Sequence, residues 1–290
     1  MTAMIYKNHT GRESLVTIPD QIDGEAITAI GAKAFLGIRQ IEKLVLPATI
    51  TEIGDWAFSH MSNLFELDMP ANPIRFGKKV FLDCSSLRCI HLFPDHSGNP
   101  GLPYFMADIA AVFADVNLLD PVWAVSPANH ESWMNAYDTL LISYLQQDDL
   151  VGFEPIFYGW VNDEDADVSQ KPAYLHKQRS TKVRLAFRRL LCDLHLSDAH
   201  RDILYTYLRE HMPWGSQPFG HTAVWDYLPK EYGHDIQYYP ILKQAGALPL
   251  EHIPELVEHL SNASPEVIAW ILKYQEENQD HFDFFDSLSL

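Results

Sequence analysis

The 290-residue sequence contains little cysteine, few basic residues and no long apolar stretch. Its three cysteines are too few for the disulfide framework that holds small secreted proteins together. It has 21 lysines and arginines and 39 acidic residues, and the formal net charge of -18 argues against broad electrostatic capture of nucleic acid or anionic lipid. No segment is long enough to cross a bilayer, and the first residues lack the apolar run of a signal peptide. We therefore expect a cytoplasmic protein that binds neither nucleic acid nor a membrane.

Motifs that would indicate an enzyme or a metal site are missing as well. The sequence contains no G-x-S-x-G, no Walker loop and no G-x-G-x-x-G, and its 14 histidines include no H-E-x-x-H pair. An acidic run at residues 163–167 begins like a calcium-binding loop, but Val168 and Tyr174 occupy the positions where such a loop needs glycine and glutamate. We therefore expect no metal, no cofactor and no enzymatic activity, and we interpret the run as a solvated loop.

The most informative feature that is present is a regular repeat, in which glycine, phenylalanine and aliphatic residues recur at one constant interval. Side chains alternate along a strand, so the aliphatic columns should point into a common core, and the phenylalanines should fill that core from the convex side. The glycines should permit a tight or left-handed backbone where each return segment begins. The spacing Ile41-x-x-Leu44-x-Leu46 is the L-x-x-L-x-L pattern of a leucine-rich repeat. The columns are Gly31, Gly54 and Gly77; Phe35, Phe58 and Phe81; Leu44, Leu67 and Ile90; Leu46, Met69 and Leu92.

Three segments of this repeat resemble a known family. They read IPDQIDGEAITAIGAKAF, LPATITEIGDWAFSHMSNLFEL and GKKVFLDCSSLRCIHL. They are similar to the BspA-like subfamily of bacterial leucine-rich repeats, whose units follow the pattern I-P-x-x-V-x-x-I-G-x-x-A-F-x-x-C-x-x-L. The resemblance covers residues 14–93. It implies a solenoid used for recognition, and it supplies no catalytic residue.

The two ends of the repeat are predicted from local patterns. Residues 4–16 have the pattern of a hairpin, which would cap the first rung of the solenoid. The step from Pro19 to Pro47 exceeds the regular interval by five residues, which we place in a turn around Asp23 and Gly24. Prolines and glycines between residues 94 and 103 end the repeat. We therefore predict a leucine-rich-repeat domain of about four rungs at residues 1–100 and a second domain at residues 101–290.

The second domain is predicted to be α-helical, because its apolar residues recur with a period of 3.6. Ser197 with Asp198, and Pro265 with Glu266, are typical helix starts. We expect a stacked helical array, which makes the fold class of the whole chain α+β. The residues that carry the helical period are Ile109, Val112, Phe113 and Val116; Trp133, Tyr137, Leu141 and Tyr144; Val183, Phe187, Leu190, Leu191 and Leu194.

The strand residues between the core positions should point outward and form a candidate binding surface. We predict that this surface binds another protein, so that the chain acts as an interaction or scaffolding module. Cys84 aligns with apolar positions and should be a buried thiol, whereas Cys89 aligns with outward positions. The alternative is that this face packs against the C-terminal helices. The candidate partner-binding residues are Lys43, Val45, Glu66, Asp68, Cys89 and His91.

Two other classes of function are left open by the sequence. An enzyme with its site in the helical half would use a cluster of polar and aromatic residues. A secreted adhesin, as known among relatives of the repeat family, would need an export signal, which is not seen in this sequence. The residues of the enzymatic alternative are Trp214, His221, Trp225 and Asp226.

Charge is distributed unevenly along the chain. Residues 89–170 contain 13 acidic residues and no lysine or arginine, and seven basic residues follow at once. We predict that the two blocks face each other and couple the two halves of the chain; nucleic-acid contact by the basic block is the alternative. Phenylalanines at residues 282–285 lie in an acidic tail, which either docks on the helices or offers a peptide to a partner. The basic residues are Lys171, Lys177, Arg179, Lys182, Arg184, Arg188 and Arg189.

Overall fold

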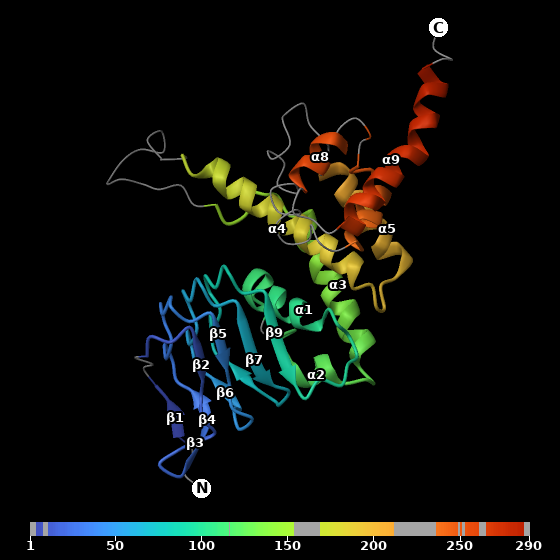
Figure 1. Ribbon diagram of the computed structural model, residues 1–290. Helices are drawn as coiled ribbons and strands as arrows, with labels where there is room; N and C mark the ends of the chain where they lie inside the picture. Colours follow the sequence, from blue (N-terminus) through green and yellow to red (C-terminus); the bar gives the residue numbers. More distant parts are fainter. Residues whose placement is uncertain are drawn as a thin grey trace. The chain divides into compact units, whose positions relative to one another are not determined.

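The computed structural model describes residues 4–7, 11–115, 117–153, 169–211, 236–248, 250, 253–260 and 265–286 (Figure 1). The chain forms two compact units, Met1–Leu140 and Leu141–Leu290. In the described residues, the last strand ends at Phe93 and the first helix starts at Leu102, so the change from strand to helix falls between them, close to residue 100. The boundary between compact units falls later, within a helix. The division at residue 100 stays a prediction about domains.

Two parallel sheets form the N-terminal solenoid. In the later rungs, neighbouring strands are one repeat apart and in register, so that Lys43 lies opposite Glu66 and Glu66 lies opposite Cys89. This confirms the predicted solenoid of about four rungs and, with the helices that follow it, the α+β class. One sheet contains β2 (Leu15–Thr17), β5 (Lys43–Val45), β7 (Glu66–Pro70) and β9 (Cys89–Phe93). The other contains the parallel strands β1 (Met4–Tyr6), β4 (Glu25–Ile30), β6 (Glu52–Ile53) and β8 (Arg75–Phe76), with the short antiparallel strand β3 (Gln21–Ile22) paired to β4.

The predicted hairpin at residues 4–16 is wrong. Strand β1 pairs in parallel with β4, and β2 pairs in parallel with β5, so the two strands belong to different sheets. They form the first rung, and the backbone partner of each lies in the next rung rather than across a local turn. The turn at Asp23 and Gly24 is confirmed, since β3 and the first residues of β4 form an antiparallel pair on either side of it.

Aromatic rings form a continuous column through the solenoid core. Phe35 and Phe58 are fully buried, and Phe81 is nearly so. Ring centroids lie 5.7 Å apart between Phe35 and Phe58 and 5.5 Å apart between Phe58 and Phe81. Tyr6 extends the column into the first rung, because its ring stacks on Phe35 at 5.5 Å. The predicted interior role of this column is therefore confirmed, and each inner ring contacts a ring on both sides.

The glycine column is required by close packing between rungs, and not by the left-handed backbone that the sequence predicted. A Cβ atom at Gly54 would lie 2.6 Å from the backbone nitrogen of Ala32, and none of the three glycines has a positive φ. Glycine is needed here because adjacent rungs approach too closely for any side chain. The left-handed positions come two residues later, at Lys33, Trp56 and Lys79, with φ of 60°, 59° and 53°.

Helices follow the last rung within the first unit. Helix α1 (Leu102–Asp108) packs against β9, and a π-helical turn at Ile109–Phe113 continues it. Asp120 accepts hydrogen bonds from the amides of the first turn of α2 (Pro121–Val125). In α3 (His130–Gln146), the predicted apolar stripe is buried at Trp133 and Tyr137.

The described part of the second unit is helical. Helix α4 packs against α5 and α7, and α8 packs against α9. The predicted start at Ser197 is confirmed, because its Oγ accepts a hydrogen bond from the His200 amide at 3.2 Å, and a helix also begins at Pro265 as predicted. The helices are α4 (Lys171–Leu191), α5 (Asp198–His211), α7 (Tyr238–Gln244), α8 (Ile253–His259) and α9 (Pro265–Asp286).

Four cations of α4 are buried: Lys182, Arg184, Arg188 and Arg189. Lys182 and Arg179 both contact the Asp149 carboxylate, each at 2.8 Å. Burial, the largest single influence, raises the pKa of Asp149, but the hydrogen bonds and positive charges of Arg179 and Lys182 together outweigh it and hold this pKa below its ordinary value. One member of the acidic block thus pairs with the basic block, inside the second unit. Coupling between the two halves stays a prediction, and residues 154–168 lie outside the described residues.

Candidate functional site

The strand sheet β2-β5-β7-β9 presents two rows of side chains on its outer face. Core residues Leu44, Leu67 and Ile90 are fully buried between these rows, which confirms the predicted alternation. Because the register is constant, residues of one row come from neighbouring strands about 4.8 Å apart. The rows, which together we call the outer face, are Leu15, Lys43, Glu66 and Cys89, and Thr17, Val45, Asp68 and His91.

An ion-pair cluster occupies the middle of the outer face. The Lys43 Nζ lies 2.8 Å from Glu66 Oε2 and 3.3 Å from Asp68 Oδ2. The hydrogen bond to Glu66 raises the pKa of Lys43 and outweighs the lowering by burial, and Asp68 raises it further. The side chain of Lys43 is 33% exposed, so the cluster contributes only about 0–1 kcal/mol to stability. Its main effect is to fix the direction of the Lys43 ammonium across β7.

Cys89 aligns with outward positions in the sequence, but its side chain is buried. Cys89 is 8% exposed, although it lies in the outward row opposite Glu66. It belongs to the last strand, β9, against which α1 packs. His91, two residues along the same strand, is exposed. Cys84 is a buried thiol as predicted, and burial raises its pKa to about 12.

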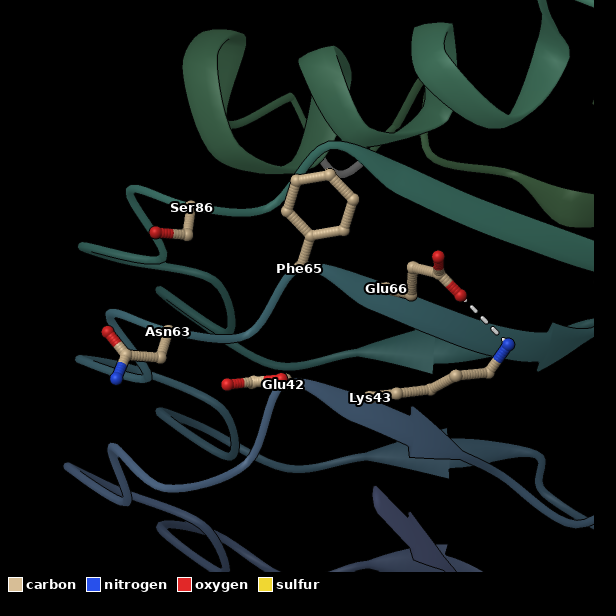
Figure 2. Close-up of a pocket in the computed structure, with 6 residues that line it drawn as sticks. All are labelled: Glu42, Lys43, Asn63, Phe65, Glu66 and Ser86. Atoms are coloured by element: carbon tan, nitrogen blue, oxygen red, sulfur yellow. Dashed lines mark hydrogen bonds and ion pairs between the residues drawn. The ribbon is translucent and has the colours of Figure 1, made fainter. Parts of the chain in front are cut away.

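A hollow of about 450 Å³ opens beside the ion-pair cluster. Figure 2 shows its lining, with the Phe65 ring and the Glu42 carboxylate next to the Lys43–Glu66 pair. Phe65 is 48% exposed, so a large aromatic side chain meets water inside a polar rim. The six lining residues, which we call the hollow, are Glu42, Lys43, Asn63, Phe65, Glu66 and Ser86.

The backbone explains why side chains converge at this place. Glu42 and Phe65 each precede a strand, one repeat apart. The carbonyl of Glu42 accepts hydrogen bonds from the amides of Phe65 and Glu66, at 2.7 and 3.0 Å. The carbonyl of Phe65 likewise accepts from the amides of Arg88 and Cys89, at 3.0 and 3.3 Å. Two successive amides on one carbonyl turn the chain at each strand start, and the hollow lies along these turns.

Sequence reasoning missed four of the six hollow residues, because it considered only the strand positions. A signal was present in the columns that precede each strand. Phe65 shares its column with Glu42 and Arg88, so one aromatic residue stands among charged ones. Asn63 and Ser86 also lie one repeat apart. The column thus indicates one large apolar side chain beside charged residues at the start of a strand.

The remaining predictions concern metal binding, membrane insertion and residues in the helical half. Within the described ranges, no group of three or more histidine, cysteine and carboxylate residues could hold a metal ion. The same ranges contain no helix with the length and apolar character needed to span a bilayer. The acidic run at residues 163–167 lies outside the described residues, as do the side chains of the C-terminal phenylalanines. The residues of the enzymatic alternative, Trp214, His221, Trp225 and Asp226, also lie outside them.

Comparison with protein families matches residues 12–98 to the BspA type leucine rich repeat region, in six copies. Residues 12–98 form a BspA-type repeat region. This confirms the resemblance derived from the sequence and matches the solenoid in the structure. The repeat region is the part of the chain that carries the outer face and the hollow.

Two solved structures show similarity to this chain. A leucine-rich repeat protein of T. pallidum is 29% identical over 32% of this chain and 44% of its own, with a TM-score of 0.30. A leucine-rich cell surface protein from Faecalibacterium prausnitzii A2-165 is 24% identical over 30% of this chain and 27% of its own, with a TM-score of 0.28. The match thus spans less than half the length of either protein. No curated protein matches the chain.

Proposed function

We propose that the protein is a non-enzymatic binding module that holds another protein on the outer face of its repeat region. The observation that carries this proposal is the hollow beside the Lys43–Glu66 pair, which contains an exposed aromatic ring. A stack of parallel strands presents ordered side chains on a rigid backbone, which suits recognition. The constant register supports the same role, because a partner meets side chains at fixed spacing.

The predicted contact residues divide into two groups. Lys43, Val45, Glu66, Asp68 and His91 are half-buried or exposed and suit direct contact. Cys89 is withdrawn from the proposed contact set, because burial keeps its side chain from a partner. Three hollow residues outside the strands, Glu42, Phe65 and Asn63, join the set.

The proposal is tested by reversing charge on the outer face. We expect the double variant Glu66→Lys and Asp68→Lys to capture at least about tenfold less partner than the wild type in affinity purification from the source cell. The physical reason is that like charges at an interface cost several kcal/mol. The matched control is Glu25→Lys with Glu52→Lys, which makes the same change of charge on β4 and β6. Partners that bind both variants equally well would overturn the proposal.

A second variant guards against a folding defect in the first. His91 is exposed, so His91→Lys should leave the melting temperature unchanged. We expect it to weaken the same interactions as the double variant, to a smaller extent. A partner set that responds to neither variant would show that the outer face is covered by other parts of the chain, as the alternative holds.

The place of action is part of this proposal. We propose that the binding module acts in the cytoplasm, following the composition of the sequence. Fractionation of the source cell with an antibody against the protein tests this directly. Recovery in the surface or secreted fraction would favour the adhesin alternative, and the outer face would then meet an extracellular partner.

A further inference from the structure

We infer that the hollow takes a partner segment in which an aromatic or aliphatic side chain lies next to lysine or arginine. The inference rests on the proposed function and adds the chemistry of the segment. It follows from three observations: the exposed Phe65 ring, the excess of carboxylates around it, and the backbone hydrogen bonds on the floor of the hollow.

The apolar part of the segment is specified by Phe65. Nearly half of its surface is exposed, and the other lining residues outside the strands, Glu42, Asn63 and Ser86, are polar. A side chain placed on this ring would remove two apolar surfaces from water, and a ring would add favourable offset or edge contacts. The hollow has room for such a side chain, at about 450 Å³.

The charged part is specified by the imbalance of charge. Two carboxylates, Glu42 and Glu66, line the hollow together with one cation, Lys43, which Glu66 and Asp68 already hold. Glu42 is exposed and forms no ion pair with any residue that the structure describes. An arriving lysine or arginine would meet an unpaired carboxylate, whereas an arriving aspartate or glutamate would be repelled by Glu42 and Glu66.

The backbone at the hollow favours recognition through side chains over main-chain pairing. The carbonyls of Glu42 and Phe65 each accept two amide hydrogen bonds already, so both are occupied. A partner strand therefore finds no free acceptor at these two positions. The segment is read through its side chains, which explains why the charge and the ring matter together.

The experiment uses a defined probe and the full-length protein. The probe is the dye-labelled peptide Gly-Lys-Phe-Lys-Gly with blocked ends, and its binding is followed by fluorescence anisotropy at low salt. The comparison peptides are Gly-Glu-Phe-Glu-Gly and Gly-Lys-Ser-Lys-Gly, which reverse the charge or remove the ring. We expect saturable binding of the first peptide and at least about tenfold weaker binding of each of the others.

Variants locate the binding. We expect Glu42→Lys and Phe65→Ser each to weaken binding of the first peptide about fivefold or more, and Glu42→Lys to improve binding of the glutamate peptide. The control Glu25→Lys carries the same change of charge on β4 and should leave the affinity unchanged. An equal loss in Glu25→Lys would show general attraction to an acidic chain and would overturn the inference.

This test is independent of the pull-down from the source cell. If the outer-face variants lose their partner but the lysine peptide binds no better than the glutamate peptide, the proposed function stands and the inference is wrong. If the peptide binds at the hollow and no partner depends on the outer face, the proposed function is wrong.

Discussion

The two units both contain a lysine paired with a carboxylate, but they place the pair in different surroundings. On the outer face, the Lys43 side chain is 33% exposed and has two carboxylate partners. In the second unit, the Lys182 side chain is 3% exposed, and Asp149 and the carbonyl of Gln147 accept its hydrogen bonds. The solenoid is held by its apolar columns and carries its charges on the surface. The second unit includes charge in its interior, so the same kind of pair there affects stability.

The largest effect is expected in the aromatic column. Phe58→Ala should destabilise the first unit by about 4 kcal/mol, because the variant loses a fully buried ring that contacts Phe35 and Phe81. Hydrogen exchange read by mass spectrometry measures the loss and shows the amides in which it occurs. The control Phe65→Ala removes a half-exposed ring and should cost less than about 1 kcal/mol. Equal losses in the two variants would contradict the importance of the column.

The buried ion pair should give the next largest effect. Asp149→Asn leaves the Lys182 ammonium buried with a weakened partner and should destabilise the second unit by about 3 kcal/mol. Lys182→Met should cost far less, since Asp149 keeps Arg179 and the new side chain is apolar. Hydrogen exchange of α4 amides measures both.

The same pair gives a dependence on pH. The pKa of Asp149 is lower in the folded protein than its ordinary value of 3.8, so its contribution is complete above that pH and is lost as the pH falls through the folded pKa. The difference in stability between the wild type and Asp149→Asn should therefore shrink below about pH 4. A difference that stays constant down to pH 2 would show that ionisation of Asp149 is not its source.

The surface pair should have the smallest effect. Lys43→Met removes the cation from the outer face and should change the stability of the first unit by less than about 1 kcal/mol, because the pair is exposed to solvent. Thermal unfolding with and without added salt measures this. A loss comparable to that of Asp149→Asn would remove the distinction between the two pairs.

The sequence predicted the interior of the solenoid well, because the repeat places equivalent residues on top of one another. Phe35 and Phe58 were expected inside, and both are buried. The same pattern failed at residues 4–16, because a local alternation of apolar residues does not reveal the partner of a strand. Each partner lies in the next rung, far along the chain, as the pairing of Met4 with Ile27 shows.

The candidate surface was predicted only in part. Strand alternation located Lys43 and Glu66, but the burial of Cys89 depends on its tertiary surroundings, which the alternation does not describe. The hollow was not predicted, because Glu42 and Phe65 precede the strands. They come together only through hydrogen bonds from two amides to one backbone carbonyl. Burial of four cations on α4 was also not predicted, since a list of charges does not show which of them will find partners inside the fold.

The hairpin at Asp23 and Gly24 has a consequence for how such a protein can change in length. The rungs on either side keep their register although the step from Pro19 to Pro47 is five residues longer than the others. Additional chain at this corner is thus absorbed without disturbing the columns, whereas an additional residue within a strand would shift every column after it. Growth by loops is permitted at the corners, and growth along the axis is permitted only in whole repeat units. A tag or a recognition loop grafted between Ile22 and Glu25 should accordingly leave the rest of the solenoid intact.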